Sequence, residues 1–333
     1  MSVCAAILGC SGPELTAEEA AFFRDVRPWG FILFGRNIET PDQVRRLTGS
    51  LRETVGRADA PILIDQEGGR IQRLGPPHWR AYPTGRAYGE LPQPQRREIT
   101  RLGARLIAHD LADLGINVDC VPVLDVPDPE GHEIIGDRAY GDTPEDVALL
   151  GRAACEGLIA GGVLPIVKHI PGHGRARADS HLELPVVDAS WDELYGRDFA
   201  PFRALSDMPM AMTAHVIYSA IDAEQSATTS EAVFEKVIRG AIGFDGLVMC
   251  DDLSMKALSG SFEERAAMSL AAGCDVVLHC NGDLGEMRAV VEGAGELAGR
   301  AAERARAALS RIPGTPEPLD HAEALARFDA AFR

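Results

Sequence analysis

The residues with the clearest chemical potential lie in one short segment. KHIPGHGRARADSH, residues 168–181, contains three of the nine histidines, His169, His173 and His181. Three imidazoles this close point first to a metal site, although the segment has neither an H-x-H pair nor the H-E-x-x-H spacing of helical zinc sites. The other interpretation is proton transfer by one imidazole. Asp179 stands two residues before His181, so its carboxylate can hydrogen-bond one ring nitrogen and leave the other free for a substrate.

A purely structural interpretation of the same triplet has to be weighed beside these two. Asp179, Ser180 and His181 can form a turn or a helix cap that only stabilises a loop, and for an arbitrary D-S-H triplet that is the commoner outcome. We favour proton transfer here because two more histidines stand nearby, and because the segment follows a predicted strand, where binding loops are usual.

Two adjacent carboxylates form the second signature. Asp251 and Asp252 follow the apolar run GLVMC, and carboxylates in such a place can act as a nucleophile, a metal ligand or a helix cap. If the run is a strand, Asp251 ends it and points across the open end of the sheet. Asp252 then begins the turn and can cap the following helix, so the two acids need not share a role.

The elements that position these residues follow a regular order. Short apolar runs alternate with longer amphipathic stretches, and runs that are apolar throughout are typical of parallel strands covered on both faces. The eight runs are CAAILG (4–9), GFILFG (30–35), APILID (60–65), VDCVPVLDV (118–126), GVLPIVK (162–168), MPMAMTA (208–214), GLVMCDD (246–252) and CDVVLHC (274–280). The predicted helices cover residues 16–26, 41–55, 95–114, 144–161, 191–206, 230–242 and 262–273.

Eight βα units in one chain favour a single-domain (β/α)8 TIM barrel of the α/β class, with an open doubly wound sheet as the alternative. The barrel is preferred because no G-x-G-x-x-G turn follows the first run. We expect residues 1–315 to form the barrel. Residues 316–333, PEPLDHAEALARFDAAFR, are expected to form a C-terminal helical extension packed on its outside.

A barrel places its chemistry at the carboxyl ends of its strands. Polar segments of this chain follow the third to seventh runs, in order DQEGGRIQRL (65–74), LDVPDPEGHEIIGDRAYGD (124–142), residues 168–181, AHVIY (214–218) and DDLSM (251–255). Long charged loops on a rigid scaffold are typical of binding loops. The barrel hypothesis therefore brings all five segments to one rim.

Composition excludes several classes of protein. The chain has 33 basic and 50 acidic side chains, a net charge of −17, whereas a nucleic-acid-binding protein needs a basic face. No apolar run reaches the roughly twenty residues that cross a bilayer. The seven cysteines are scattered without a C-x-x-C pair, which favours reduced thiols and a cytoplasmic location. The opening MSVCAAILGC ends like a lipoprotein cleavage site but has no basic region before it, so we interpret it as a strand.

Taken together, the motifs resemble those of a known family. KHIPGHG with ADSH, DQEGGRIQRL, GDRAYGD, MTAHVIY and GFDGLVMCDDLSM are similar, from the first strand to the eighth, to motifs of the family 3 glycoside hydrolases. More narrowly, they resemble the NagZ type, the bacterial exo-β-N-acetylglucosaminidases of peptidoglycan recycling, which are compact single-domain barrels. Ile170 stands where the family's KHFPGHG has phenylalanine, and RAYG where it has RSFG. Both changes leave the polar residues in place.

The resemblance implies a role for each matching residue. Asp251 would be the nucleophile, His181 the general acid/base, and Asp179 the residue that orients and tunes His181. The substrate-binding side chains would be Asp65, Arg73, Arg138, Lys168 and His169. The resemblance implies neither a metal nor a cofactor.

The implied activity is that of a retaining β-N-acetylhexosaminidase. It would remove terminal non-reducing β-1,4-linked N-acetylglucosamine from peptidoglycan turnover fragments, N-acetylglucosaminyl-1,6-anhydro-N-acetylmuramic acid and its peptides. The small muropeptide substrate would be the partner, with no nucleic acid, membrane or obligate protein partner. Three alternatives stay open: a phosphorylase with the same covalent intermediate, a metal-dependent barrel hydrolase built on His169, His173 and His181, and a sugar-binding barrel without turnover.

The remaining polar residues carry weaker expectations. His173 is expected to hydrogen-bond within its loop rather than touch substrate, and His215 to line the site without a catalytic role. Asp125 is a binding residue or a turn former, Glu67 a supporting acid or a loop partner, and His279 is left open. Three methionines that alternate in a predicted strand are expected to be packing residues: Met208, Met210 and Met212.

Overall fold

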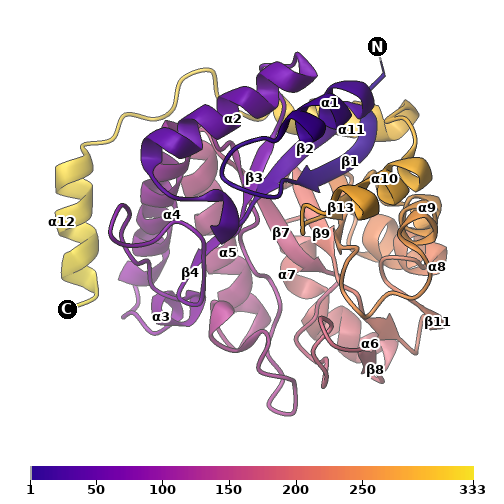
Figure 1. Ribbon diagram of the computed structural model, residues 1–333. Helices are drawn as coiled ribbons and strands as arrows, with labels where there is room; N and C mark the ends of the chain where they lie inside the picture. Colours follow the sequence, from indigo (N-terminus) through magenta and orange to yellow (C-terminus); the bar gives the residue numbers. More distant parts are fainter. Residues whose placement is uncertain (1) are drawn as a thin grey trace.

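The computed structural model describes residues 2–333 and has a closed parallel barrel at its centre (Figure 1). The eight strands pair in the order β1-β13-β12-β9-β7-β6-β3-β2, and β1 closes the ring by pairing with β2. Each strand overlaps one of the eight predicted apolar runs, although β2 begins two residues before its run and β7 ends two residues after its own. The strands are β1 (Cys4–Gly9), β2 (Pro28–Leu33), β3 (Ile62–Ile64), β6 (Val118–Asp119), β7 (Leu164–Ile170), β9 (Met210–Thr213), β12 (Leu247–Asp252) and β13 (Val276–His279).

Helices follow each strand and form the outer layer, which confirms the predicted (β/α)8 barrel. They are α1 (Ala17–Val26), α2 (Pro41–Val55), α4 (Gln95–Asp113), α5 (Pro144–Ala160), α6 (Trp191–Glu193), α7 (Ala200–Ala204), α8 (Glu231–Val233), α9 (Phe262–Ala272) and α10 (Leu284–Ala294). Two π-helical segments continue α6 and α8, namely η3 (Leu194–Asp198) and η4 (Phe234–Ala241).

Short-range signals set where the helices begin. Thr16, Thr40 and Thr143 each accept a hydrogen bond from the backbone N–H three residues on, the usual N-cap interaction. Proline follows the cap in α2 and α5, where its missing N–H would have had no helical partner. The predicted helices were therefore placed to within one or two residues.

The fourth barrel strand is shorter than the run that predicts it. Residues 118–126 were expected to form one strand, but regular pairing covers only Val118 and Asp119. Pro122 has no N–H to donate to a neighbour, and beyond it only an isolated bridge joins Val123 to Lys168. Two backbone hydrogen bonds, from the Lys168 N–H to the Pro122 carbonyl and from the Leu124 N–H to the Lys168 carbonyl, still hold this segment against β7.

Several small elements were not predicted. After β3, a hairpin of β4 (Gln66–Gly68) and β5 (Ile71–Gln72) precedes the short helix α3 (Gly85–Gly89). A three-stranded sheet joins β8 (Val186–Val187), β10 (Ile217–Tyr218) and β11 (Asp222–Ser226). The short 3₁₀ turns are η1 (Gly35–Asn37) and η2 (Gly136–Arg138). Apart from η1, these pieces belong to the loops that follow β3, β6, β7 and β9, so they shape the rim.

The chain ends with α11 (Gly299–Leu309) and α12 (His321–Ala331). Figure 1 shows α12 at the edge of the molecule beside α4, and Phe328 of α12 is buried against Tyr82 and Tyr88. The division into a barrel of residues 1–315 and a C-terminal extension stays a proposal. Across residues 2–333 no helix is long and apolar enough to cross a membrane, and the seven cysteines are buried and unbridged.

Candidate active site

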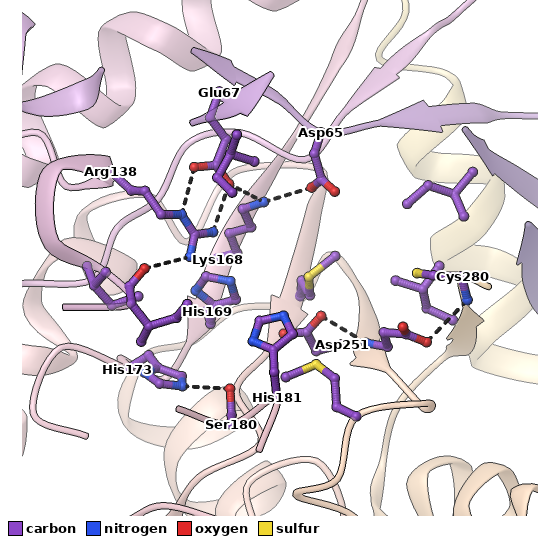
Figure 2. A pocket seen from close by; sticks show the side chains of 18 of the residues that line it. Asp65, Glu67, Arg138, Lys168, His169, His173, Ser180, His181, Asp251 and Cys280 are labelled. Carbon is purple, nitrogen blue, oxygen red and sulfur yellow. Dashed lines mark hydrogen bonds and ion pairs between the residues drawn. The ribbon is translucent and has the colours of Figure 1, made fainter. Parts of the chain in front are cut away.

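A pocket opens where the carboxyl ends of the barrel strands meet (Figure 2). Its volume, open solvent included, is about 760 Å³. All the residues that the sequence assigned to catalysis or binding line it, with the exception of Asp179. Four of the five predicted rim segments therefore meet at this pocket. AHVIY contributes no lining residue, and the expectation that His215 lines the site was wrong, because His215 is fully buried outside the pocket lining.

Lys168 lies at the centre of one wall. From β7 its Nζ reaches Asp65 Oδ1 at 3.0 Å and Glu67 Oε1 at 2.7 Å, with only 3% of its side chain exposed. Arg73 donates to Asp65 Oδ2 at 3.0 Å and covers the ring of Phe34. Burial alone would raise the pKa of Asp65, but the two cations outweigh it and lower that pKa.

Glu67 completes this wall, and sequence reasoning had left its role open. Arg138 donates two parallel hydrogen bonds to its carboxylate, both of 2.8 Å, the strongest geometry available to that pair. Burial opposes ionisation, yet Arg138 and Lys168 lower the pKa of Glu67 to about 2. We call the five side chains the ion-pair cluster: Asp65, Glu67, Arg73, Arg138 and Lys168.

The β4–β5 hairpin brings the cluster together. Gln66 Oε1 accepts hydrogen bonds from the backbone N–H groups of Arg73 and Leu74, which fixes the end of the hairpin. Gly68 has a φ of +99° and lies against the carbonyl of Pro83, so a side chain there would collide with backbone. The glycines of DQEGG are thus needed for a turn that holds Asp65 and Arg73 within contact of each other.

A buried acid beneath the hairpin was not singled out from the sequence. Asp119 is fully buried at the end of β6, where its Oδ1 accepts from the N–H of Gln66 and its Oδ2 has no partner among the described residues. Burial raises its pKa to about 8. An acid inside the apolar run VDCVPV was the signal that could have found it.

His169 and His173 share one buried carboxylate. Asp125 Oδ2 lies 2.6 Å from His169 Nδ1, and its Oδ1 accepts from the backbone N–H of both histidines at 3.2 and 2.6 Å. A carboxylate only accepts, so Nδ1 of His169 carries the proton. Asp125 therefore supports the two histidines from outside the pocket lining, so it is not the binding residue that was one of its two predicted roles.

Asp179 and His181 form the predicted pair in the loop between β7 and β8. Oδ1 of Asp179 accepts from Nδ1 of His181 at 2.8 Å and from its backbone N–H at 2.9 Å. Burial would raise the pKa of Asp179, but these two hydrogen bonds lower it. The imidazole is 59% exposed, and its Nε2 is the nitrogen left for a substrate. We call these two residues the dyad.

Asp251 lines the pocket from the end of β12, and its Oδ1 accepts from the N–H of Asp252 at 2.8 Å. Asp252 does begin a turn, because its carboxylate accepts from the N–H and hydroxyl of Ser254 and from the N–H of Cys280. It does not cap the next helix. That expectation was wrong, since α9 begins ten residues later with Ser261 as its cap.

A chain of hydrogen bonds behind β12 holds the backbone of Asp252. His215 Nε2 lies 3.1 Å from the carbonyl of Asp252, and His215 Nδ1 lies 2.7 Å from Thr228 Oγ1, which lies 2.8 Å from Thr213 Oγ1. Burial lowers the pKa of His215, so Nε2–H donates and Nδ1 accepts. Each group then donates to the next: Thr213 to Thr228, Thr228 to His215, and His215 to the carbonyl of Asp252, the residue after Asp251.

The structure also shows the surroundings of His279 and of the three methionines. His279 is fully buried and lies 3.2 Å from a carboxylate oxygen of Glu286. Met212 lines the pocket, whereas Met208 and Met210 do not. All three methionines are buried, as expected for packing residues.

No group of three or more His, Cys, Asp or Glu side chains among residues 2–333 is placed to hold a metal ion. The three clustered histidines instead have separate partners. His169 contacts Asp125, His173 contacts Ser180 Oγ at 3.1 Å, and His181 contacts Asp179. In this arrangement the imidazoles do not converge on one point, as ligands of a shared metal must.

Comparison with known proteins places the whole chain in one family. Residues 9–312 match the glycosyl hydrolase family 3 N-terminal domain. A β-hexosaminidase of Tolumonas auensis is 38% identical over 92% of this chain and 91% of its own length. The crystal structure of native NagZ from Neisseria gonorrhoeae has a TM-score of 0.85 and 32% identity over 99% of this chain and 96% of that one, and its complex with N-trifluoroacetyl-D-glucosamine has a TM-score of 0.87 and 31% identity over 100% and 99%.

The chain therefore belongs to glycosyl hydrolase family 3. Its relatives place it among the NagZ-type β-N-acetylglucosaminidases, glycoside hydrolases of the β-N-acetylhexosaminidase class. The resemblance found in the sequence motifs is confirmed.

Proposed function

We propose that this enzyme is a retaining exo-β-N-acetylglucosaminidase of the cytoplasm that acts on peptidoglycan turnover fragments. Its substrate would be N-acetylglucosaminyl-1,6-anhydro-N-acetylmuramic acid with or without its peptide. One observation carries the mechanism: Asp251 and His181 line the same pocket, with Asp179 on the far nitrogen of His181 and the ion-pair cluster on the opposite wall.

In the first step the Asp251 carboxylate attacks the anomeric carbon as the glycosidic C–O bond breaks. Protonated His181 gives its Nε2 proton to the leaving oxygen, so the product leaves as a neutral alcohol. Asp179 accepts from Nδ1, which stabilises the imidazolium before transfer and fixes the tautomer afterwards.

In the second step the neutral His181 removes a proton from water. The water oxygen attacks the anomeric carbon, the bond to Asp251 breaks, and the sugar leaves with its original β configuration. Most glycosidases use a second carboxyl group here. An imidazole can do the same work near neutral pH, and when neutral it adds no anion beside Asp251.

The ion-pair cluster supports exo action. Its carboxylates and cations offer acceptors and donors to the hydroxyls of a terminal sugar, with His169 beside Lys168 in β7. Because the cluster is buried and internally paired, it forms a fixed wall rather than an open groove. A wall at the non-reducing end would let only the last sugar of a chain enter.

A chromogenic β-N-acetylglucosaminide and the natural disaccharide are the test substrates. The proposal expects hydrolysis of both, with net retention by NMR, and loss of turnover in Asp251→Ala. Unchanged turnover in that variant, or an inverted first product, would contradict it. The peptidoglycan assignment is tested separately: chitobiose and the anhydromuramic disaccharide are compared, and a higher kcat/KM for chitobiose would overturn it.

Two controls address the competing chemistries. In phosphate buffer a phosphorylase would release N-acetylglucosamine 1-phosphate, which the hydrolase does not form. One solved NagZ of Neisseria gonorrhoeae is a complex with a zinc ion, so activity is also measured after exhaustive chelation. Loss restored by one metal would favour the metal-dependent alternative.

A further inference from the structure

Ser180, the middle residue of the D-S-H triplet, lies in a different environment from its neighbours. Among residues 177–184 Ser180 alone is buried, with 4% of its surface exposed, although it stands between Asp179 and the exposed His181. Its Oγ lies 3.1 Å from Nε2 of His173, and Figure 2 shows this contact at the edge of the pocket below His181. The triplet is thus attached to the protein through its central side chain.

The partner imidazole is itself fixed. His173 is 3% exposed, and its backbone N–H donates to Asp125 at 2.6 Å. The carbonyl of Gly172, one residue before, accepts from the buried hydroxyl of Tyr218 at 2.7 Å. Burial lowers the pKa of His173 to about 4, so the ring is neutral at neutral pH and its bond to Ser180 does not depend on a charge.

Hydrogen bonds within the triplet join its residues into one turn. Asp179 Oδ1 binds the N–H and Nδ1 of His181, and the Asp179 carbonyl accepts from the N–H groups of Leu182 and Glu183. These bonds close a single turn. They are all internal to the turn, so they shape the dyad but do not place it relative to the sugar.

We propose that Ser180 is a positioning residue for the acid/base, which places His181 over the pocket through the anchor Ser180–His173–Asp125. Asp125 also holds His169, so the same buried carboxylate fixes a predicted sugar-binding residue and the acid/base in one frame. This inference rests on the proposed role of His181. It assigns to Ser180 no contact with the reacting atoms.

The test uses the dependence of the first chemical step on the leaving group. For aryl β-N-acetylglucosaminides from 4-nitrophenyl to unsubstituted phenyl, kcat/KM depends on protonation most when the leaving group is poor. We expect Ser180→Ala to lower kcat/KM about 10-fold for the phenyl substrate and less than about 3-fold for the nitrophenyl one, the size of one lost hydrogen bond. Ser180→Thr keeps the hydroxyl and should restore most of the loss. Glu183→Ala, an exposed change in the same turn, is the matched control.

A double-mutant cycle separates positioning from general damage. If Ser180 acts only through His181, Ser180→Ala should cost nothing further in a His181→Ala background. Equal losses for both substrates, or additive losses in the cycle, would overturn the proposal for Ser180. If His181→Ala itself leaves the leaving-group dependence unchanged, the acid/base assignment fails and the inference falls with it. If kcat/KM depends more steeply on the leaving group in His181→Ala but not in Ser180→Ala, the acid/base assignment stands and only the role of Ser180 is overturned.

Discussion

The two sides of the pocket are built in opposite ways. On one side the Lys168 side chain is 3% exposed and paired with two carboxylates that come from another part of the chain. On the other side the His181 ring is 59% exposed, and its hydrogen-bonding partner stands two residues away. Binding groups that must hold a fixed sugar are part of the folded core, whereas the group that exchanges protons with an alcohol and then with water stays accessible.

This contrast predicts that the ion-pair cluster couples binding to stability, while the dyad affects activity alone. Breaking a buried ion pair leaves an uncompensated charge in the interior. Removing an exposed side chain leaves nothing unpaired inside. Mutations in the ion-pair cluster should therefore lower the free energy of unfolding, whereas mutation of His181 should leave it unchanged.

Of the two sides, the dyad is expected to give the larger effect on activity. His181→Ala should lower kcat/KM for an unactivated β-N-acetylglucosaminide by about 10²- to 10⁴-fold, the usual contribution of a general acid/base. Its thermal midpoint should match the wild type, as measured by calorimetry. A midpoint lowered by several degrees would show that the dyad is structural and would remove the contrast.

Lys168→Met tests the opposite side. It leaves Asp65 and Glu67 without their shared cation, so we expect the free energy of unfolding to fall by about 3–5 kcal/mol. Denaturant titration measures the change, and Lys236→Met, at an exposed position, should stay within about 0.5 kcal/mol of the wild type. If both lysines behave alike, the cluster contributes nothing special to the fold.

Asp119 should make the stability of the folded protein depend on pH. Its pKa is raised to about 8 by burial, so between the unfolded pKa near 4 and pH 8 the unfolded chain releases a proton that the folded protein keeps. The contribution of Asp119 to the free energy of unfolding is fully present below about pH 4 and is lost as the pH rises toward 8. Asp119→Asn keeps an oxygen that can accept from the Gln66 N–H, but its side chain does not titrate. The free energy of unfolding of this variant, relative to the wild type, should therefore rise by about 1.4 kcal/mol per pH unit in that range. A difference that stays constant from pH 5 to pH 8, in paired thermal melts, would show that Asp119 is ionised in the fold.

The smallest effect is expected behind the nucleophile. Thr228→Val interrupts the hydrogen-bond chain that ends on Asp252, at a cost of about 1 kcal/mol in stability. We expect kcat to fall a few-fold with KM nearly unchanged, because the chain acts on the position of Asp251 and not on the sugar wall. Thr228→Ser keeps the hydroxyl and should behave like the wild type; a rise in KM alone would contradict this role.

Local patterns were sufficient to predict the barrel and the dyad. Strand runs such as CAAILG and caps such as Thr16 are readable because their signal lies within a few residues, and Asp179 lies two residues from His181. The pairing of Glu67 with Arg138 joins residues 71 positions apart, and no spacing rule reports it. The sequence therefore predicted most of the side chains that line the pocket, but not which of them neutralise each other there.

The same limit applies to elements formed by tertiary contact. Strands β8, β10 and β11 are short, and β11 is largely polar and partly exposed, so they have no apolar period to detect. For residues 118–126 the composition predicted too long a strand. The composition of this segment is that of a strand throughout, but regular pairing ends at Asp119, and beyond Pro122 only the isolated bridge between Val123 and Lys168 remains.

The central claim, that Asp251 forms a covalent bond to the sugar, is tested most directly by trapping. A 5-fluoro analogue of an N-acetylglucosaminyl donor slows both steps, so the glycosyl-enzyme can accumulate and be weighed by intact-mass spectrometry. We predict one added glycosyl residue per chain, located by peptide mapping on Asp251 and absent from Asp251→Ala. An adduct on any other residue would contradict the mechanism, as would turnover of the analogue through an inverted product with no adduct formed.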